Sequence, residues 1–254
     1  MPTLTAPRQQ AAIALSVFFL ALVSGRLFSY LGGVPATLLW KLSWIGLSMV
    51  GLFLAHRLTP VGSLVELGLG GSVGTGASFA FVASLPMLLT FALAAKPNPS
   101  LALGATLMTS IVSPMSEEVL FRGYLFRQLY RRAGWNFFWA VALTAGVFGL
   151  AHFWNLFGKT GAAGMASEIA VIAAGGAFYA WLFIRWNDNL WVPIALHSFM
   201  NLWCILFACD NAVGSWRNNV ARGVTVVLAI VLTRLRNRRI LARAREGPPI
   251  APGG

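Results

Sequence analysis

The side chains of this sequence that could do chemistry are two carboxylates, a guanidinium, two imidazoles and an amide. They are Glu117, Glu118, Arg122, His152, His197 and Asn201. All six lie in apolar stretches, although the 254-residue chain has only seven acidic residues and three histidines. Hydrolysis of a peptide bond needs an activated water, an acid for the leaving amine and stabilisation of the oxyanion, and these side chains can divide those tasks. The sequence therefore contains the groups for a hydrolytic site.

The two adjacent glutamates are followed at helical spacing by an arginine. Glu118 and Arg122 stand at i and i+4, so their side chains can meet, whereas Glu117 is rotated by about 100° around the helix axis. We expect Glu118 and Arg122 to support the site and Glu117 to be left free to react. The alternative is that Glu-Glu-x-x-x-Arg is only a buried ion-pair cluster or a cytoplasmic helix end.

Residue counting places the remaining polar groups at a similar depth. Glu117 lies about 16 residues before the turn at Ala133 and His152 lies about 19 residues after it, so two antiparallel helices would hold them within about 5 Å of one level. His197 and Asn201 stand at i and i+4 and share one helix face. Counted from the connection before their helix, both reach the same level. All four side chains can therefore meet in one pocket.

The elements that must position these residues are expected to be membrane helices. Hydrophobic residues make up 57% of the chain and charged residues 10%, against about 25% charged in ordinary soluble domains. Several apolar stretches approach the roughly 20 residues that cross a bilayer. We predict an all-α fold, a polytopic membrane helix bundle of about eight transmembrane helices. The expected spans are 11–31, 37–56, 75–95, 101–130, 135–155, 167–185, 189–208 and 218–236.

The expected organisation is one membrane domain between two short tails. We expect an N-terminal tail at 1–10, a transmembrane domain at 11–236 with a catalytic core at 101–208, and a basic, disordered tail at 237–254. The formal net charge of +12 could suggest nucleic acid as a partner. The cations, however, lie between spans and in the C-terminal tail, which fits lipid headgroups and topology signals better.

The distribution of the cations predicts the topology. One set, expected on the side of the two termini, comprises Arg8, Arg57, Arg127, Arg131, Arg132, Arg185, Arg234, Arg236, Arg238, Arg239, Arg243 and Arg245. The opposite loops hold mainly Lys41, Lys96, Lys159 and Arg217. Because positive loops stay inside, both termini are expected in the cytoplasm. The compact size and short loops favour a bacterial protein of the inner membrane.

Three motifs in order resemble those of a known family. The sequence reads Glu117-Glu118-Val-Leu-Phe-Arg122, then Phe148-Gly-Leu-Ala-His152, then His197-Ser-Phe-Met-Asn201. This order resembles the CPBP family of intramembrane endopeptidases, also called the ABI family. That family includes the CAAX prenyl proteases and bacteriocin-processing or self-immunity proteins. The resemblance covers residues 117–201 and says little about the part of the chain that precedes them.

The resemblance implies a role for each matching residue. Glu117 with His152 would activate the water, and His197 with Asn201 would stabilise the tetrahedral oxyanion. The supporting pair of Glu118 and its arginine would orient the site. Each assignment is carried over from the motif and does not follow from spacing.

A zinc-dependent mechanism stays open beside a metal-free one. Glu117, His152 and His197 would be the ligands, since two histidines and a carboxylate with an open fourth position make a catalytic zinc set. The His-Glu-x-x-His pattern of common zinc proteases does not occur in the sequence, and the family has been described both as metal-dependent and as glutamate-type. We favour a glutamate-activated water without a cofactor, and assign no metal ligand firmly.

The sequence thus predicts an intramembrane endopeptidase whose partners are the lipid bilayer and a peptide or membrane-anchored protein substrate. Candidate substrates are a prenylated CAAX protein, a bacteriocin or signalling-peptide precursor, or the anchored tail of an exported protein. Two alternatives belong to other classes. A transporter would be expected to show paired, broken repeat halves, and a proteolytically inactive membrane binding or immunity protein could keep the same residues for a different task.

Overall fold

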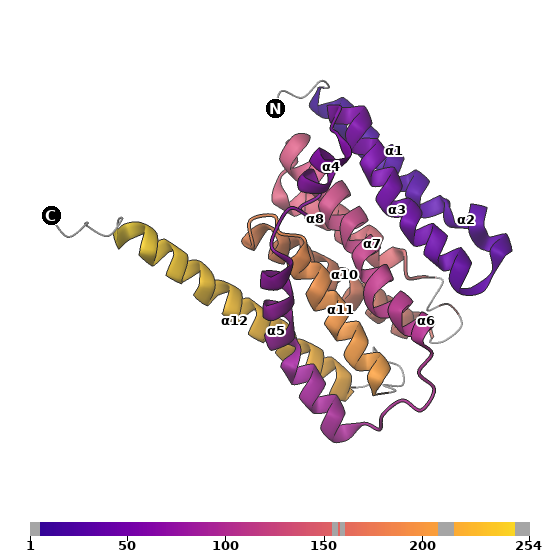
Figure 1. Cartoon of the computed structure of the whole chain (residues 1–254), viewed down its shortest axis with the longest axis vertical. Coiled ribbons are helices and arrows are strands. Elements are labelled where there is room, and N and C mark those ends of the chain that lie inside the picture. The colour runs from indigo at the N-terminus through magenta and orange to yellow at the C-terminus, as the bar shows by residue number, and fades with distance from the viewer. Residues whose placement is uncertain (1–5, 154–156, 158–160, 208–215, 247–254) are drawn as a thin grey trace.

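The computed structural model describes residues 6–153, 157, 161–207 and 216–246, and every regular element in this part of the chain is helical (Figure 1). The elements are α1 (Pro7–Val23), α2 (Gly25–Phe28), a 3₁₀ turn (Ser29–Leu31), α3 (Gly33–His56), α4 (Pro60–Glu66), α5 (Val73–Ala94), α6 (Leu103–Leu107), α7 (Ser113–Glu118), α8 (Phe137–Leu150), α10 (Ala162–Arg185), α11 (Trp191–Leu206) and α12 (Trp216–Glu246). In Figure 1, α1 to α3 lie on one side, α5 and α12 on the other, and α7, α10 and α11 between them. The predicted all-α class is confirmed.

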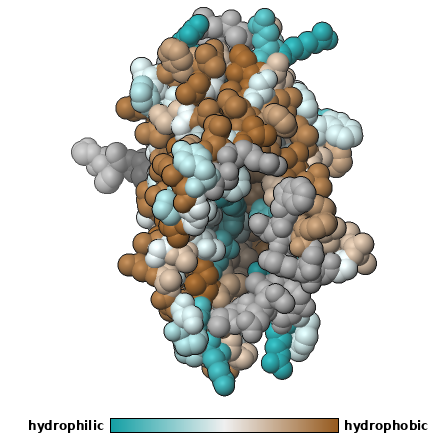
Figure 2. Space-filling model, turned by 90° about the vertical axis from the view of Figure 1, so that its right-hand side faces the viewer, coloured by the Kyte–Doolittle hydropathy of each residue, from teal (hydrophilic) through white to brown (hydrophobic). Residues whose placement is uncertain are grey.

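The long helices are apolar enough to cross a membrane. Four of the described helices meet this criterion, Gly33–His56, Val73–Ala94, Ala162–Arg185 and Trp216–Ala242. Shorter apolar helices accompany them at Pro7–Val23, Phe137–Leu150 and Trp191–Leu206. The face in Figure 2 is mainly hydrophobic, with hydrophilic residues gathered at its two ends and in a central hollow. The chain is therefore an integral membrane protein, and the prediction of about eight full spans is confirmed only in this coarser form.

The last helix is longer than its apolar part. We expected the final span to end at 236 and a disordered tail to follow, but α12 continues to Glu246. Arginine and alanine, which dominate this extension, are good helix formers, and the first helix-breaking residue after it is Gly247. The candidate span itself runs to Ala242 and the helix to Glu246, so both extend past 236. The remainder of the expected tail, 247–254, lies outside the described residues.

The helix that carries the two glutamates changes its winding along its length. Between and after α6 and α7 it forms π-helical turns at Met108–Val112, Val119–Phe126 and Gln128–Arg132. A π turn bonds residue i to i+5 and holds more residues than an α turn, and such turns are frequent at functional sites. Pro114 at the start of α7 lacks the N–H that the preceding turn would use. Glu117 and Glu118 end α7 between two π-helical segments, which set the direction of their side chains.

Close contacts hold this helix against its neighbours. Phe121 packs edge-on against Phe148 of α8, with ring centroids 4.9 Å apart. Gly51 of α3 lies against the phenol of Tyr124, and a Cβ atom at position 51 would overlap that ring. The segment 119–126 is buried throughout. The glutamate pair just before it is therefore anchored by packing on several sides.

A carboxylate on α4 binds arginines at the C-terminal end of the helix that carries the glutamate pair. Glu66 accepts hydrogen bonds from Arg132 at 2.9 and 2.8 Å, and Arg127 lies 3.9 Å away. Burial alone would raise the pKa of Glu66, but the hydrogen bond from Arg132 and the charges of both arginines outweigh it and hold that pKa below its ordinary value of 4.5. This cluster ties α4 to the helix that carries the glutamate pair.

Glu66→Gln is expected to lower the thermal stability of the detergent-solubilised protein at neutral pH, and the difference from wild type should vanish in acid. A carboxylate whose pKa is lowered on folding stabilises the protein above its unfolded-state pKa. That contribution is lost as the pH falls through the folded-state pKa, which here lies below 4.5. Unfolding midpoints of both proteins between about pH 7 and about pH 3 test this. A gap that stays constant into acid would contradict the assigned ion pair.

Candidate active site

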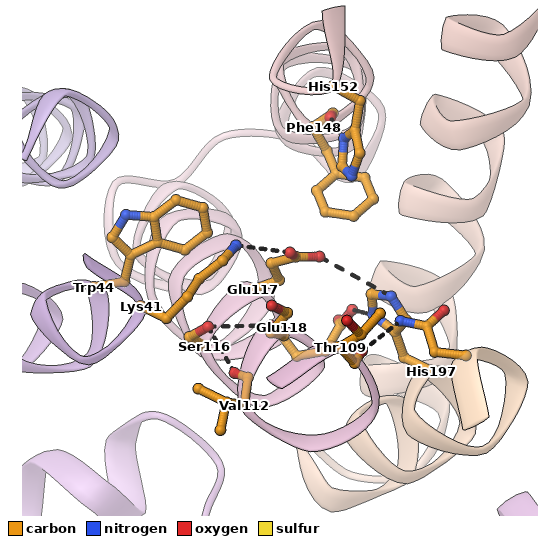
Figure 3. A network of polar contacts seen from close by, with 12 residues as sticks. Lys41, Trp44, Thr109, Val112, Ser116, Glu117, Glu118, Phe148, His152 and His197 are labelled. Atoms are coloured by element: carbon orange, nitrogen blue, oxygen red, sulfur yellow. Dashed lines mark hydrogen bonds and ion pairs between the residues drawn. The ribbon is translucent and has the colours of Figure 1, made fainter. Parts of the chain in front are cut away.

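The carboxylate of Glu117 lies between two basic side chains from other helices (Figure 3). Its Oε1 is 2.8 Å from Nζ of Lys41 on α3, and its Oε2 is 4.0 Å from Nε2 of His197 on α11. Glu117 is only 9% exposed, so these interactions act in a medium where charges attract more strongly than in water. The expectation that Glu117 would be left free is wrong, because an ammonium group holds one of its oxygens.

Lys41 is the site residue that the sequence did not reveal. The charge distribution predicts a loop position for Lys41, but this residue lies within α3 and is 7% exposed. Its Nζ is 3.9 Å from the centroid of the Trp44 ring and 5.1 Å from that of Trp40, which are cation–π distances. A lysine between two tryptophans of an apolar helix is a signal that could have found it, since a charge inside a membrane protein normally faces a partner.

Glu118 joins two of the predicted side chains. It is fully buried, and its Oε1 accepts hydrogen bonds from Nη1 of Arg122 at 3.1 Å and from Nδ1 of His197 at 2.9 Å. Arg122 also lies over the ring of Phe148, 4.4 Å from its centroid, and His197 stacks on Tyr179. The ion pair expected from the spacing is therefore present. It directs the Nδ1 proton of His197 toward Glu118 and leaves Nε2 facing Glu117.

His152 follows Ala151, the C-cap of α8, and is held by a residue of that helix. Its Nδ1 donates to the carbonyl of Phe148 at 2.8 Å, and its ring packs edge-on against that phenylalanine. In the neutral imidazole this bond places the proton on Nδ1 and leaves Nε2 as an acceptor. Figure 3 shows the His152 ring above the carboxylate of Glu117. Two proton acceptors of the predicted set therefore face one space.

Asn201 lies one turn from His197 on the same face of α11. Its Nδ2 donates to the carbonyl of Thr109 at 3.1 Å, in the π-helical turn 108–112. A side-chain amide has two N–H donors, so this bond orients the group and leaves a second donor for a ligand. The structure therefore places an oriented donor one turn from the imidazole, as the spacing predicted.

One cavity of about 870 Å³ takes in the four residues predicted to be catalytic. Glu117, His152, His197 and Asn201 line it, together with apolar side chains of α10 and α12. The supporting pair of Glu118 and its arginine lies outside this lining. Cavities of this size hold small molecules or short stretches of peptide. The four residues predicted to react thus line the cavity, and the two predicted to support them lie outside its lining. The chemical role of each residue stays a prediction.

The residues of the zinc alternative do not converge on a common point. Among the described residues, no three His, Cys, Asp or Glu side chains are placed to hold one ion. The contacts with Glu118 and Lys41 take up Nδ1 of His197 and Oε1 of Glu117, so only Nε2 and Oε2 of these two residues are left as donor atoms. A catalytic zinc requires three protein ligands at about 2 Å from one position. The donor set as arranged does not fit this ion, so no step is derived through it.

Comparison with known proteins matches the part of the chain that holds this cavity. Residues 99–203 match the family model described as "Type II CAAX prenyl endopeptidase Rce1-like". The protein named "Putative membrane peptidase YdiL" of Bacillus subtilis (strain 168) is 30% identical over 104 residues, which are 41% of this chain and 37% of that relative. No solved structure matches the chain. All six residues singled out from the sequence fall within 99–203, and the resemblance inferred from three motifs is confirmed.

Proposed function

Because residues 99–203 of this chain match the model of the Rce1-like type II CAAX prenyl endopeptidase family, we propose that the protein is an intramembrane endopeptidase. It would hydrolyse a peptide bond in a peptide precursor or a membrane-anchored protein. The observation that carries the proposal is a single cavity lined by a carboxylate, two imidazoles and an amide, namely Glu117, His152, His197 and Asn201. These are the groups that a hydrolysis by activated water needs.

Glu117 and His152 supply the acceptors that activate the water. A water molecule between them would be oriented by Nε2 of His152 and would donate a proton to Glu117. Since Lys41 engages Oε1 of Glu117, the proton goes to Oε2. The water oxygen then attacks the carbonyl carbon of the scissile peptide, and the protonated carboxyl group passes its proton to the leaving amine.

His197 and Asn201 supply the donors for the oxyanion that this attack creates. Asn201 has an N–H beyond the one that it gives to Thr109. An imidazolium donates from both nitrogens, so His197 can hold Glu118 with Nδ1 and the oxyanion with Nε2. Because these donors are already oriented by buried partners, little reorganisation is needed when the charge develops.

Lys41→Met is expected to lower kcat for cleavage by about 10- to 100-fold with a smaller effect on KM, because misplacing a reacting group by about 1 Å costs about that much. Methionine keeps the apolar length beside Trp44 but removes the ammonium that holds Glu117. Lys41→Arg keeps a cation and should retain more activity than Lys41→Met. Steady-state kinetics of the purified variants test this, and an unchanged kcat in Lys41→Met would show that the ion pair is only structural.

The test of the function compares membranes of cells that produce wild type with those that produce His152→Ala. Mass spectrometry of chain termini is expected to find new cleavage products with wild type and none with His152→Ala. His56→Ala is the matched control, since His56 bonds Gln128 at 2.7 Å and does not line the cavity, and its products should persist. Products that persist in His152→Ala would contradict the proposal. An inactive binding or immunity protein would yield no products with any variant.

A metal-free mechanism predicts that chelation leaves the activity intact. The protein would be dialysed against a strong chelator, assayed and analysed for bound metal. Activity that is retained after the metal has been removed agrees with a water that Glu117 activates without a metal ion. Loss of activity that added zinc restores would favour the alternative, in which Glu117, His152 and His197 bind the ion.

The proposed orientation places both termini in the cytoplasm of a bacterial inner membrane. Support comes from the cations around α4, where Arg127 and Arg132 gather at Glu66 and Arg131 lies 3.3 Å from Asp188. Positive residues of short connections stay inside. Two reporter enzymes would be fused after α12, one that is active only in the cytoplasm and one that is active only in the periplasm. The first is expected to be active, and activity of the second would show the opposite orientation.

A further inference from the structure

Arg222 is a cation that lines the candidate active-site cavity. It lies on α12, one turn beyond Asn219, which lines the cavity as well. Its Nη2 is 3.9 Å from Sγ of Cys204, and a thiol is only a weak hydrogen-bond partner. Within the described ranges, no carboxylate lies at ion-pair distance from Arg222. Its charge has no counterpart in this part of the chain.

The two other cations beside the site each face a carboxylate. Lys41 is 2.8 Å from Glu117, and Arg122 is 3.1 Å from Glu118. An ionisable side chain inside a membrane protein is costly to keep and marks a functional site by default. Arg222 differs from both because it lines the cavity and, among the residues that the structure describes, faces no carboxylate. A ligand that enters the cavity can supply the missing negative charge.

The contact with Cys204 fixes the place of Arg222 relative to the reacting groups. Cys204 follows Asn201 by one turn on α11, and residues so spaced have Cβ atoms about 5–6 Å apart on one helix face. A group bound by Arg222 therefore lies near the oxyanion donor. The 3.9 Å between Nη2 and Sγ adds to this spacing, so at about 3.3–3.6 Å per residue of extended chain the bound group lies within a few residues of the scissile bond.

The cavity that Arg222 lines has a large apolar share of wall. Val171 and Phe178 of α10 and Val226 and Val227 of α12 line the same space. A ligand that fills it must be mainly apolar and carry one negative group opposite the guanidinium. A stretch of membrane-anchored peptide with a single acidic group has this character.

We propose that Arg222 is a specificity residue that binds a carboxylate of the peptide substrate within a few residues of the scissile bond. The proposal rests on the proposed endopeptidase function and narrows its substrate class. A guanidinium forms two parallel hydrogen bonds with a carboxylate and keeps its charge in an apolar setting. Asn219 places an amide on the same part of the wall. The carboxylate belongs to an acidic side chain or to a free C-terminus, and the probes below separate these two sources.

The probes are fluorescent peptides with an apolar anchoring helix, an apolar flanking segment and a C-terminal amide. A single Asp is moved residue by residue along the flank, and each peptide has an Asn counterpart. A second series carries a free C-terminal carboxylate in place of the amide. Binding and cleavage are measured with the full chain in lipid nanodiscs. At one position, or at the free terminus, the acidic peptide is expected to bind at least about 30-fold more tightly than its neutral counterpart.

Substitutions on α12 assign that preference to one side chain. Arg222→Gln is expected to bring the ratio of acidic to neutral peptide to about one, and Arg222→Glu to favour a Lys at the same position. Arg217→Gln is the matched control, because Arg217 lies on the same helix beside Trp216 and outside this cavity, and it should keep the wild-type ratio. Equal binding of acidic and neutral peptides by wild type, or a ratio unchanged in Arg222→Gln, would overturn the proposal.

Separate binding and cleavage measurements distinguish failure of this proposal from failure of the function. Acidic peptides that bind through Arg222 but are not cut would preserve the carboxylate site and remove the endopeptidase. Cleavage without any preference for a carboxylate would preserve the endopeptidase function and remove the carboxylate site. Phosphatidylglycerol vesicles that abolish an Arg222-dependent binding signal, without any competition by acidic peptide, would assign the guanidinium to a lipid headgroup and overturn the proposal.

Discussion

Glu117→Gln is expected to lower kcat/KM for peptide cleavage by about 10³-fold or more, because general-base catalysis contributes up to about 10⁴-fold. Glutamine has the same shape but accepts no proton from water. The oxyanion donors on α11 stay in place, so substrate binding should change little. Steady-state assays of the purified protein in nanodiscs measure the effect. Activity within a few-fold of wild type would remove Glu117 from the mechanism.

The ion pair with Lys41 requires a matched control for this substitution. Glu117→Gln alone leaves a buried ammonium without its carboxylate, which destabilises the protein. The double variant with Lys41→Met removes both charges and should regain stability while staying inactive. Glu168→Gln changes a carboxylate of α10 outside the cavity and should keep full activity. Restored activity in the double variant would show that the loss came from the stranded charge and not from the missing base.

Arg122→Leu is expected to lower the free energy of unfolding by about 3–5 kcal/mol, the cost of breaking a buried ion pair by removing one partner. Glu118 is fully buried and Arg122 only 2% exposed, so water cannot replace the lost charge. The substitution also removes the guanidinium that lies over Phe148. Unfolding in mixed micelles, followed by circular dichroism, measures the change. A loss below about 1 kcal/mol would mean that the pair behaves like an exposed one.

A second variant separates this stability effect from catalysis. Replacing Glu118 and Arg122 together by leucines removes both charges, and a well-packed apolar pair often matches a buried ion pair in stability. Stability should therefore recover in part. Activity should not, because His197 loses the carboxylate that orients its Nδ1. Recovery of both properties would limit Glu118 to a structural role.

The contacts that the sequence predicted are those that depend on local geometry. Glu118 and Arg122 meet because i and i+4 side chains of one helix are neighbours whatever surrounds them. Depth counting also brought Glu117 and His152 to one cavity, since two antiparallel helices joined by a short turn keep their levels in register. The existence of the helices was predictable from their long apolar stretches. The end of α12 was not predictable in this way, because its arginine-rich extension is helical without being apolar.

The contacts that escaped the sequence join helices far apart along the chain. Lys41 and Glu117 are separated by 76 positions, and a count of positive charges near span ends treats such a lysine as a loop residue. Arg222 belongs to the last helix, outside the three motifs and outside residues 99–203. Its place at the cavity depends on how α12 packs against α5. The hydrophobic periodicity within each of these two helices does not predict how the helices pack against each other.

The π-helical turns around the glutamate pair bear on how relatives of this chain are aligned. A π turn takes up an additional residue without ending the helix. Two chains that differ by one residue within 108–126 can therefore both be continuous there, one with a wide turn and the other with an ordinary one. An alignment that forbids gaps inside helices would shift the glutamates out of register. A single-residue gap in this segment is evidence of altered winding and no argument against common ancestry.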